Sequence, residues 1–281
     1  MDEVPVPWNI HEALDDPKWK EAVMEEMKAL KGNHTWETVN APKDKKIIGC
    51  KWVFTVKYKI DGRVDRYKAR LVAQGFSQTY GIDYEETFAP VTKLNSIRVL
   101  LSIVVNLDWE LSQFDIKNAF LNGELEEEVY MKVPLGFEEE MGNSKVCKLH
   151  KSPYGLKQSP RAWSKKFSST LTDFGCKQGN ADHTLFTKHT TNGKKSILIV
   201  YVDDIIIIGD DIHEIKALKQ KLKEEFEFEV KELGEMNYFL GMEVARSKQG
   251  IIISQWKYTI DLLTETGMQD YKPRYTPLER N

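Results

Sequence analysis

Two adjacent aspartates, Asp203 and Asp204, lie between two apolar, β-branched runs in the segment SILIVYVDDIIIIG, residues 196–209. Runs this short and this apolar predict strands buried on both faces, with the aspartate pair at the tight turn of a hairpin. Carboxylates beside a dry sheet are costly unless their charge is compensated, and Mg²⁺ prefers carboxylate oxygens. The pattern therefore indicates a metal site. The alternative is a hairpin whose turn simply uses Asp, a common turn residue.

A third carboxylate, Asp115, lies in LSQFDIKNAF, residues 111–120. Here a short half-apolar strand ends at the acid, and an aromatic residue, Phe120, follows five positions later. Two strands far apart in the sequence can become neighbours in one sheet. Asp115 is therefore a candidate third carboxylate for the site of Asp203 and Asp204.

Three motifs together resemble the reverse transcriptase of copia-type LTR retrotransposon Pol polyproteins, and the likeness is to the plant members. They are YVDD at 201–204, QFDIKNAF at 113–120 and KARLVAQGF at 68–76. Further matches follow in the expected order over nearly the whole chain: WKEAVMEEMKAL, NHTW, GCKWVFTVKYKIDG, YGIDYEETFAPV, ADHTLF, YFLGMEVARS and TPLE.

The resemblance implies an α+β fold, the palm and fingers of a right-hand polymerase, with an antiparallel sheet backed by helices. It implies a single reverse transcriptase domain over residues 1–281. Fingers would span roughly 33–92 and 122–158, and palm roughly 93–121 and 159–245. The start of a thumb or connection would occupy roughly 246–281.

The implied activity is RNA-directed DNA polymerisation, extending a primer on an RNA or DNA template with deoxynucleoside triphosphates. Two Mg²⁺ ions, or Mn²⁺, would act on the attacking and leaving oxygens of an in-line displacement. Asp115 and Asp203 fit as bridging ligands and Asp204 completes the site, with Ile116 at a further metal position.

The resemblance also assigns a nucleotide pocket. Phe120 would lie under the incoming sugar and exclude a 2′-hydroxyl, although core packing is the usual role of a Phe. Lys68 and Arg70 would bind the triphosphate, and Tyr154 and Gly155 would approach base and sugar. In that loop the family usually has Leu before the Tyr. Here Pro153 removes an amide donor and restricts its neighbour, which alters the expected pocket.

Template and primer contacts are expected from seven further residues. They are Lys57, Arg66, Lys157, Gln158, Tyr201, Leu240 and Gly241. The segment around Leu240 is equally well explained as the start of a buried strand.

A long hairpin is predicted from Lys51 to Arg70, turning at Asp61-Gly62. If those two residues form the loop, three cross-strand pairs follow: Lys57 with Arg66, Thr55 with Lys68, and Val53 with Arg70. The ribbon then has one apolar and one basic face, and the basic face could contact phosphates. The alternative is a solvated outer face.

The remaining pattern predicts helices over 17–32, 95–106, 159–174, 212–227 and 256–265, with Asp211 and Glu214 as a capping box. Short strands are expected at 129–131 and 145–149. A second hairpin is expected from 242–244 and 251–253, with its turn at Gln249-Gly250.

Composition sets further bounds. The net charge is −3, but basic residues concentrate at 43–70 and 145–166, so the total can hide a basic channel. No apolar run has membrane-spanning length and no signal peptide is evident. The widely spaced Cys50, Cys147 and Cys176 suggest free thiols rather than zinc. We therefore expect an intracellular protein, in a cytoplasmic retrotransposon particle or the nucleus, with no membrane partner.

Two other functions compete with polymerisation. One is a catalytically decayed retrotransposon remnant that binds nucleic acid without copying it, which the apparent truncation after TPLE and Pro153 favour. The other is a different palm enzyme such as a nucleotidyl cyclase, which the basic hairpin disfavours. The chain would be a fragment of a larger polyprotein or a free-standing remnant.

Overall fold

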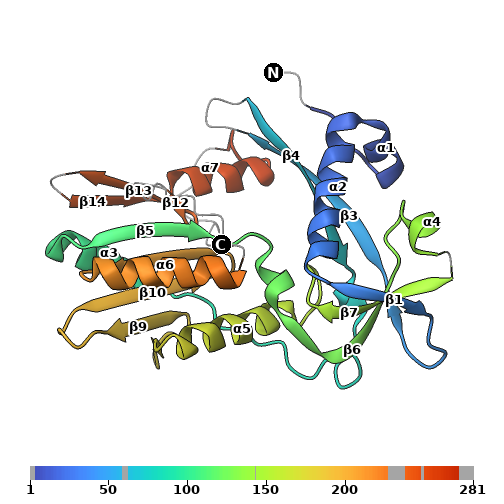
Figure 1. Ribbon diagram of the computed structural model, residues 1–281. Coiled ribbons are helices and arrows are strands. Elements are labelled where there is room, and N and C mark those ends of the chain that lie inside the picture. The colour runs from blue at the N-terminus through green and yellow to red at the C-terminus, as the bar shows by residue number, and fades with distance from the viewer. Residues whose placement is uncertain (1–3, 59–62, 143, 227–237, 248–249, 272–281) are drawn as a thin grey trace, which may run out of the picture.

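A computed structural model describes residues 4–58, 63–142, 144–226, 238–247 and 250–271 of the chain. Figure 1 shows two parts side by side. One contains a five-stranded sheet with its helices, and the other contains the N-terminal helices and two smaller sheets. The prediction of an α+β chain with antiparallel sheets backed by helices is confirmed, although one short strand pair is parallel.

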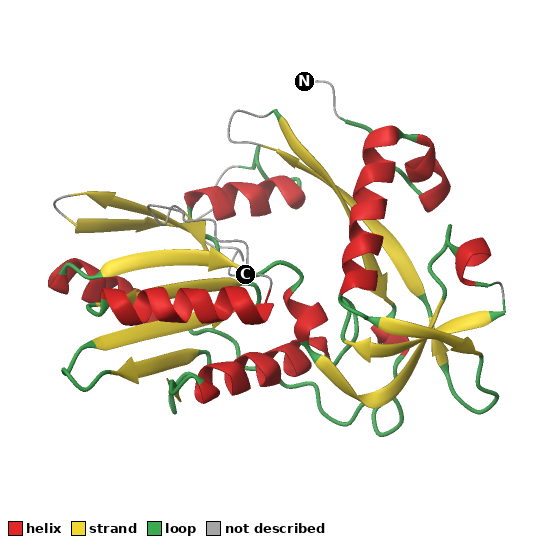
Figure 2. Ribbon diagram, in the orientation of Figure 1, coloured by secondary structure: helices red, strands yellow, loops and turns green. Residues whose placement is uncertain are grey.

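The five-stranded sheet, called the central sheet below, has the order β5-β11-β10-β9-β8 with every pair antiparallel. Helices lie along it in Figure 2. Its elements are β5 (Glu110–Asp115), β8 (Lys177–Gln178), β9 (Leu185–His189), β10 (Lys195–Tyr201) and β11 (Asp204–Gly209), with helices α3 (Leu94–Leu107), α5 (Ser159–Asp173) and α6 (Ile212–Phe226).

The four isoleucines of β11 explain why this strand is apolar throughout. Ile205 and Ile207 pack with side chains of α5 and α6 on one face of the sheet. Ile206 and Ile208 pack with side chains of α3 on the other. Each of the four is at most 2% exposed, so the prediction of a strand buried on both faces is confirmed.

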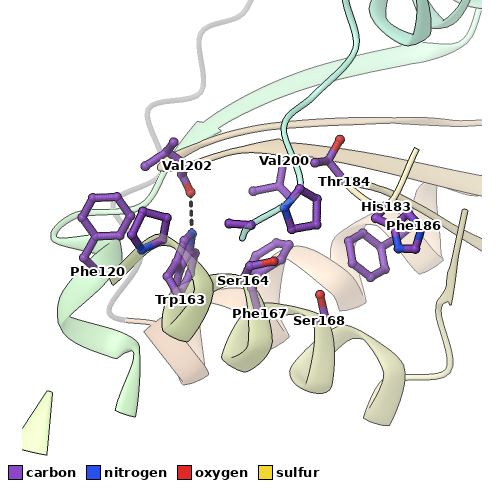
Figure 3. A pocket seen from close by; sticks show the side chains of 13 residues that line it. Phe120, Trp163, Ser164, Phe167, Ser168, His183, Thr184, Phe186, Val200 and Val202 are labelled. Atoms are coloured by element: carbon purple, nitrogen blue, oxygen red, sulfur yellow. Dashed lines mark hydrogen bonds between the residues drawn. The ribbon is translucent and has the colours of Figure 1, made fainter. Parts of the chain in front are cut away.

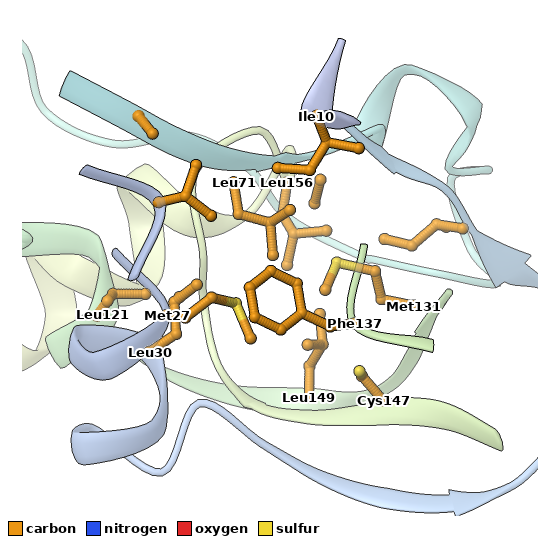
Figure 4. Packing of buried hydrophobic residues seen from close by; sticks show 14 of the residues in the cluster. Ile10, Met27, Leu30, Leu71, Leu121, Met131, Phe137, Cys147, Leu149 and Leu156 are labelled. Atoms are coloured by element: carbon orange, nitrogen blue, oxygen red, sulfur yellow. The ribbon is translucent and has the colours of Figure 1, made fainter. Parts of the chain in front are cut away.

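The second part is built around a separate core. A four-stranded sheet has the order β1-β7-β6-β2, and β3 and β4 form a two-stranded ribbon. Figure 4 shows Met27 and Leu30 packing near Leu71 and Phe137 in this core. The elements are α1 (Ile10–Asp15), α2 (Pro17–Gly32), β1 (Trp36–Asn40), β2 (Ile47–Ile48), β3 (Cys50–Tyr58), β4 (Val64–Ala73), β6 (Glu124–Lys132), α4 (Glu138–Met141) and β7 (Lys145–Lys151). Short 3₁₀ turns lie at Gly75–Ser77 and Ala119–Asn122.

The β3–β4 ribbon has the predicted register. Lys57 pairs with Arg66, Thr55 with Lys68 and Val53 with Arg70, so all three cross-strand predictions are confirmed. A bulge follows Lys57, and the predicted turn at Asp61-Gly62 lies outside the described residues. The apolar face of the ribbon packs on α2, where Trp19 makes edge-on contacts with Phe54 and Tyr67.

The C-terminal elements are β12 (Tyr238–Phe239), β13 (Met242–Ser247), β14 (Gly250–Ser254) and α7 (Trp256–Glu265). The predicted second hairpin is present, but Ser247 pairs with Gly250 and Val244 with Ile253, so Gly250 begins β14 and does not form the predicted turn. Gln249 lies outside the described residues. Phe239, Met242 and Val244 join the core that α3 forms with the central sheet.

Three local predictions need correction. The turn of the aspartate hairpin is Val202-Asp203, because Tyr201 pairs with Asp204, so Asp204 begins β11. Strand β6 is longer than 129–131 because its acidic first half continues the strand beyond the apolar residues. Asp211 does cap α6 by accepting from Glu214 N at 3.2 Å, but Glu214 pairs with Lys188 at 2.7 Å.

Among the helices that the structure describes, none combines the length and the apolar character needed to cross a bilayer.

Candidate active site

Strand pairing brings the predicted carboxylates to one edge of the central sheet. Asp115 is the last residue of β5 and pairs directly with Asp204, the first residue of β11. Asp203 lies beside them in the β10–β11 turn, and its carbonyl accepts a hydrogen bond from Ile116 N at 2.8 Å. The three acids therefore meet where two neighbouring strands end, and Ile116 adjoins them.

The β10–β11 turn is held from below by α5. Val202 has a left-handed φ of +54°, an unusual conformation for a β-branched residue. Its carbonyl accepts a hydrogen bond from Trp163 Nε1 at 2.7 Å, drawn as a dashed line in Figure 3. Because surrounding structure must stabilise such a backbone, Trp163 fixes the turn that carries Asp203.

The carboxylates repel one another electrostatically. Burial raises the pKa of Asp204 to about 6, and the neighbouring charges of Asp203 and Asp115 raise it as well. Gln113 Nε2 donates to Asp204 Oδ1 at 3.3 Å and opposes this shift. Gln113 Oε1 is buried without a hydrogen-bond partner.

These residues fit a divalent cation by their chemistry. All three side chains offer hard oxygen ligands, and a cation would relieve the repulsion that raises the pKa of Asp204. Within the part of the chain that the structure describes, no group of three or more His, Cys, Asp and Glu side chains is already arranged around a common point. The side chains would therefore have to converge further around an ion.

The basic face of the β3–β4 ribbon meets the loop after β7. Arg70 Cζ lies 4.0 Å from the centroid of the Tyr154 ring, which is within cation–π range. The Tyr154 ring meets Phe120 edge-on, with the centroids 4.7 Å apart. Three residues assigned to one nucleotide pocket, from three separate segments, are thus in contact.

Charge accumulates on the same face. Burial lowers the pKa of Lys68, and the neighbouring Arg70, Arg66 and Lys57 lower it further. Lys57 and Arg66 themselves are exposed towards the far end of the ribbon. Like charges held together in this way are a feature of sites that bind polyanions.

Gly155 is required by close packing against β4. Its φ is +97°, and a Cβ there would lie 2.1 Å from the Ala73 carbonyl oxygen. Pro153, two residues before Gly155, is buried, and its carbonyl accepts a hydrogen bond from Ser159 Oγ at 2.6 Å. The departure from the family pattern at Pro153 is therefore accommodated within a bonded loop.

The structure gives Lys157 and Gln158 internal partners. Gln158 is 2% exposed, and its Oε1 accepts from Gln78 Nε2 at 3.0 Å. Lys157 Nζ donates to the Gln78 carbonyl at 3.1 Å and lies 5.0 Å from the Tyr84 ring centroid. These contacts join the loop to the segment after β4, and they occupy polar groups predicted to meet the template.

Leu240 and Gly241 form the turn between β12 and β13. Both have positive φ, +51° and +75°, and a Cβ on Gly241 would lie 3.3 Å from the Tyr258 ring. Gln113 Nε2 also donates to the Tyr238 carbonyl at 3.3 Å, linking β12 to the strand of Asp115. Tyr201, the other predicted primer contact, is 36% exposed at the end of β10.

A small apolar cavity of about 50 Å³ lies beneath the β10–β11 turn. Figure 3 shows Phe120, Trp163 and Val202 at one end of it and Phe186 at the other. Phe120 therefore lies between this cavity and Tyr154.

Two contributors to the site were not predicted from the sequence. Gln113 is a polar residue in the buried part of β5. A polar residue at a buried strand position close to Asp115 is the signal that could have identified it. Trp163 looked like an ordinary apolar residue of α5, and only the tertiary contact with Val202 distinguishes it.

Comparison with known proteins gives one family. Residues 33–280 match the family described as reverse transcriptase (RNA-dependent DNA polymerase). The chain is 44% identical over 273 residues to the retrovirus-related Pol polyprotein from transposon RE2 of Arabidopsis thaliana, covering 95% of this chain and 18% of that protein. It is 42% identical over 277 residues to the Pol polyprotein from transposon TNT 1-94 of Nicotiana tabacum, covering 97% and 21%. The chain thus spans about a fifth of the length of these relatives.

Among solved structures, apo telomerase from Candida tropicalis, truncated from its C-terminal domain, aligns with a TM-score of 0.43 and 11% identity. The alignment covers 84% of this chain and 60% of that one.

Proposed function

Because the chain belongs to the reverse transcriptase (RNA-dependent DNA polymerase) family, among Pol polyproteins of the copia type, we propose that it is itself an RNA-directed DNA polymerase. It would add deoxynucleotides to the 3′ end of a primer paired with an RNA or DNA template. One observation carries the proposal. The strand pairing of Asp115 with Asp204 gathers the three acids at the end of the sheet, beside a basic ribbon.

Asp115, Asp203 and Asp204 are assigned as the ligands of two Mg²⁺ or Mn²⁺ ions, with the backbone at Ile116 as an additional ligand. Bound divalent ions would make the primer 3′-oxygen nucleophilic and neutralise the pyrophosphate leaving group. Gln113 orients the Asp204 carboxylate through its 3.3 Å hydrogen bond. Trp163 holds the turn that carries Asp203.

The nucleotide is assigned to the surface where Arg70, Tyr154 and Phe120 meet. Lys68 and Arg70 would pair with the triphosphate oxygens through charge-assisted hydrogen bonds. Phe120, braced by Tyr154, would lie under the sugar and exclude a 2′-hydroxyl by steric clash. Gly155 lets the backbone of its loop approach β4 closely.

The template and primer are assigned to the surfaces around these two sites. Lys57 and Arg66 would contact phosphates from the exposed end of the ribbon. Tyr201, Leu240 and Gly241 would border the primer end. Lys157 and Gln158 would act on the template chiefly by holding the shape of their loop, since their side chains are bonded internally.

The same proposal divides the chain into the parts of a right-hand polymerase. The β3–β4 ribbon and the four-stranded sheet would be fingers, over roughly 33–92 and 122–158. The central sheet and its helices would be palm, over roughly 93–121 and 159–245, and roughly 246–281 would begin a thumb or connection. We place the reaction inside the cell, in a cytoplasmic retrotransposon particle or the nucleus.

Primer extension tests the proposal. The purified chain would be given a labelled DNA primer annealed to an RNA template, with deoxynucleotides and Mg²⁺, and the products resolved by length. We expect extension that stops on chelation of the metal. A chain that binds the primer–template duplex but extends nothing, with either Mg²⁺ or Mn²⁺, would instead be a decayed remnant that only binds nucleic acid.

A further inference from the structure

The edge of β4 that faces away from β3 donates hydrogen bonds to two segments from different parts of the chain. Leu71 N donates to Glu26 Oε1 of α2 at 3.1 Å. Ala73 N, the next amide on the same edge, donates to the Tyr154 carbonyl at 2.7 Å. Amides two residues apart on a strand are about 7 Å apart and point the same way. Glu26 and Tyr154 are therefore neighbours along one strand edge.

Arg70 is next to the first of these two attachment points. It precedes Leu71 in β4, and its guanidinium stacks on the Tyr154 ring, with Cζ 4.0 Å from the centroid. Arg70 Nε is buried and has no hydrogen-bond partner. The contact with the Tyr154 ring therefore helps to fix the position of this guanidinium.

The Glu26 carboxylate interacts electrostatically with Arg70 and Lys68. Burial raises the pKa of Glu26, while the hydrogen bond from Leu71 and the charges of Arg70 and Lys68 lower it. Burial lowers the pKa of Lys68, and the charge of Glu26 opposes this; burial raises the pKa of Tyr154, and the charge of Glu26 adds to that rise. The carboxylate therefore lies within the electrostatic surroundings of the assigned nucleotide pocket.

Helix α2 (Pro17–Gly32) packs on β4 through Trp19, Val23 and Met27, which are at most 2% exposed. A carboxylate on this rigid, well-packed helix can hold a strand edge in one position.

We propose that Glu26 is a positioning residue for nucleotide binding. By accepting from the Leu71 amide it fixes the edge of β4, and it thereby aligns Arg70 and Tyr154 for the triphosphate and the sugar. The inference rests on the proposed polymerase function. It makes helix α2 part of the support of the nucleotide pocket.

The test compares two substitutions of Glu26 with a control on the same helix. Glu26→Gln keeps an oxygen that can accept from Leu71 N, whereas Glu26→Ala keeps none. Glu21→Ala changes an exposed acid of α2. We expect Glu26→Ala to raise the deoxynucleotide KM about tenfold with kcat within about twofold, a change typical of a coupled network. Glu26→Gln and Glu21→Ala should stay within about threefold of the wild-type KM. A wild-type KM in Glu26→Ala, even with a lowered melting temperature, would reduce Glu26 to a structural residue and overturn the proposal.

A second measurement does not depend on catalysis. Amide hydrogen exchange resolved by NMR should show faster exchange at both Leu71 and Ala73 in Glu26→Ala, and at neither in Glu26→Gln. Faster exchange at Leu71 alone would mean that Glu26 does not control the Tyr154 attachment, and would overturn the proposal. If the wild-type chain incorporates no nucleotide, the polymerase function fails, and this exchange pattern still decides the role of Glu26.

Discussion

Phe120 offers the sharpest test of the nucleotide pocket, because the side chain has no chemistry beyond its shape. Its ring is half-buried, contacts the Tyr154 ring edge-on at 4.7 Å and borders the cavity under the β10–β11 turn. We predict that Phe120→Val and Phe120→Ala will admit ribonucleotides while deoxynucleotide incorporation remains measurable.

The expected magnitudes differ for selectivity and for stability. Removing a clash in an apolar pocket changes discrimination by about 2 kcal/mol, or roughly 30-fold in the ratio of kcat/KM for the two sugars. Truncating a fully buried Phe to Ala costs about 3–5 kcal/mol, so this half-buried ring should cost about 2 kcal/mol. About 1 kcal/mol of that is the ring pair with Tyr154. The melting temperature should then fall by about 4–8 °C.

Single-nucleotide incorporation with matched deoxy- and ribonucleoside triphosphates provides the assay. The quantity to compare is the ratio of kcat/KM for the two sugars, because a general packing defect depresses both values alike. Phe174→Val is the matched control. Phe174 is also partly buried and carries a cation over its ring, Lys188 Nζ at 3.7 Å, but it lies at the far end of α5. Equal losses for both sugars in the Phe120 variants, together with a lowered melting temperature, would refute the role as a steric gate.

Two further predictions concern charged residues. Lys68→Ala and Arg70→Ala should each raise the deoxynucleotide KM or weaken primer–template binding, and should flatten the salt dependence of binding; unchanged kinetics and salt slope in both would make the ribbon face a solvated surface. Asp182 accepts hydrogen bonds from the Ser96 and Thr184 hydroxyls and from the Lys93 and Thr184 amides. Burial raises the pKa of Asp182, but these hydrogen bonds outweigh burial and lower it. Because the substitution removes all four acceptor contacts, Asp182→Ala should lower the free energy of unfolding by about 3 kcal/mol at pH 7. Because the pKa of Asp182 is lower in the folded than in the unfolded chain, this stabilisation is present above about pH 4 and is lost as the pH falls through the folded pKa. In urea unfolding, the difference in free energy between the wild type and Asp182→Ala should therefore be smaller at about pH 3 than at about pH 7. A difference that stays constant would contradict this prediction.

Local patterns were sufficient for several elements. The alternation around Lys57 and the Asp61-Gly62 dipeptide predicted the pairs from Lys57–Arg66 onward in the β3–β4 ribbon, whereas the bulge pairs Tyr58 with Val64. The isoleucine run of β11 predicted burial on both faces. The helix predicted over 17–32 is α2, and Asp16 caps its start, because Asp16 Oδ1 accepts from Lys18 N at 2.8 Å.

Contacts between distant segments could not be derived in this way. No periodicity relates β5 to β11, so the pairing of Asp115 with Asp204 was expected mainly from the family resemblance. The pairing of β1 with β7 joins segments with no complementary sequence signal, and neither β1 nor β9 was anticipated. Strand partners of this kind are fixed by the packing of the whole core rather than by local preference.

The same limit applies to individual polar residues. Gln158 was predicted to face the template, but its side chain is buried and bonded to Gln78. Glu26 gave no signal among the other acids of α2, because only the fold brings it to the open edge of β4. A hydrogen bond between such distant residues has no local signature in the sequence.

The account rests most directly on the three carboxylates at the end of the central sheet. The deciding measurement is primer extension on an RNA template by Asp203→Asn, with Asp173→Asn, an exposed acid at the end of α5, as the control. The account predicts that Asp203→Asn abolishes extension while keeping the melting temperature at or above that of the wild type, because the change removes one of the mutually repelling charges but no volume. Asp173→Asn should extend normally. Extension by Asp203→Asn at the wild-type rate would contradict the assignment of the active site.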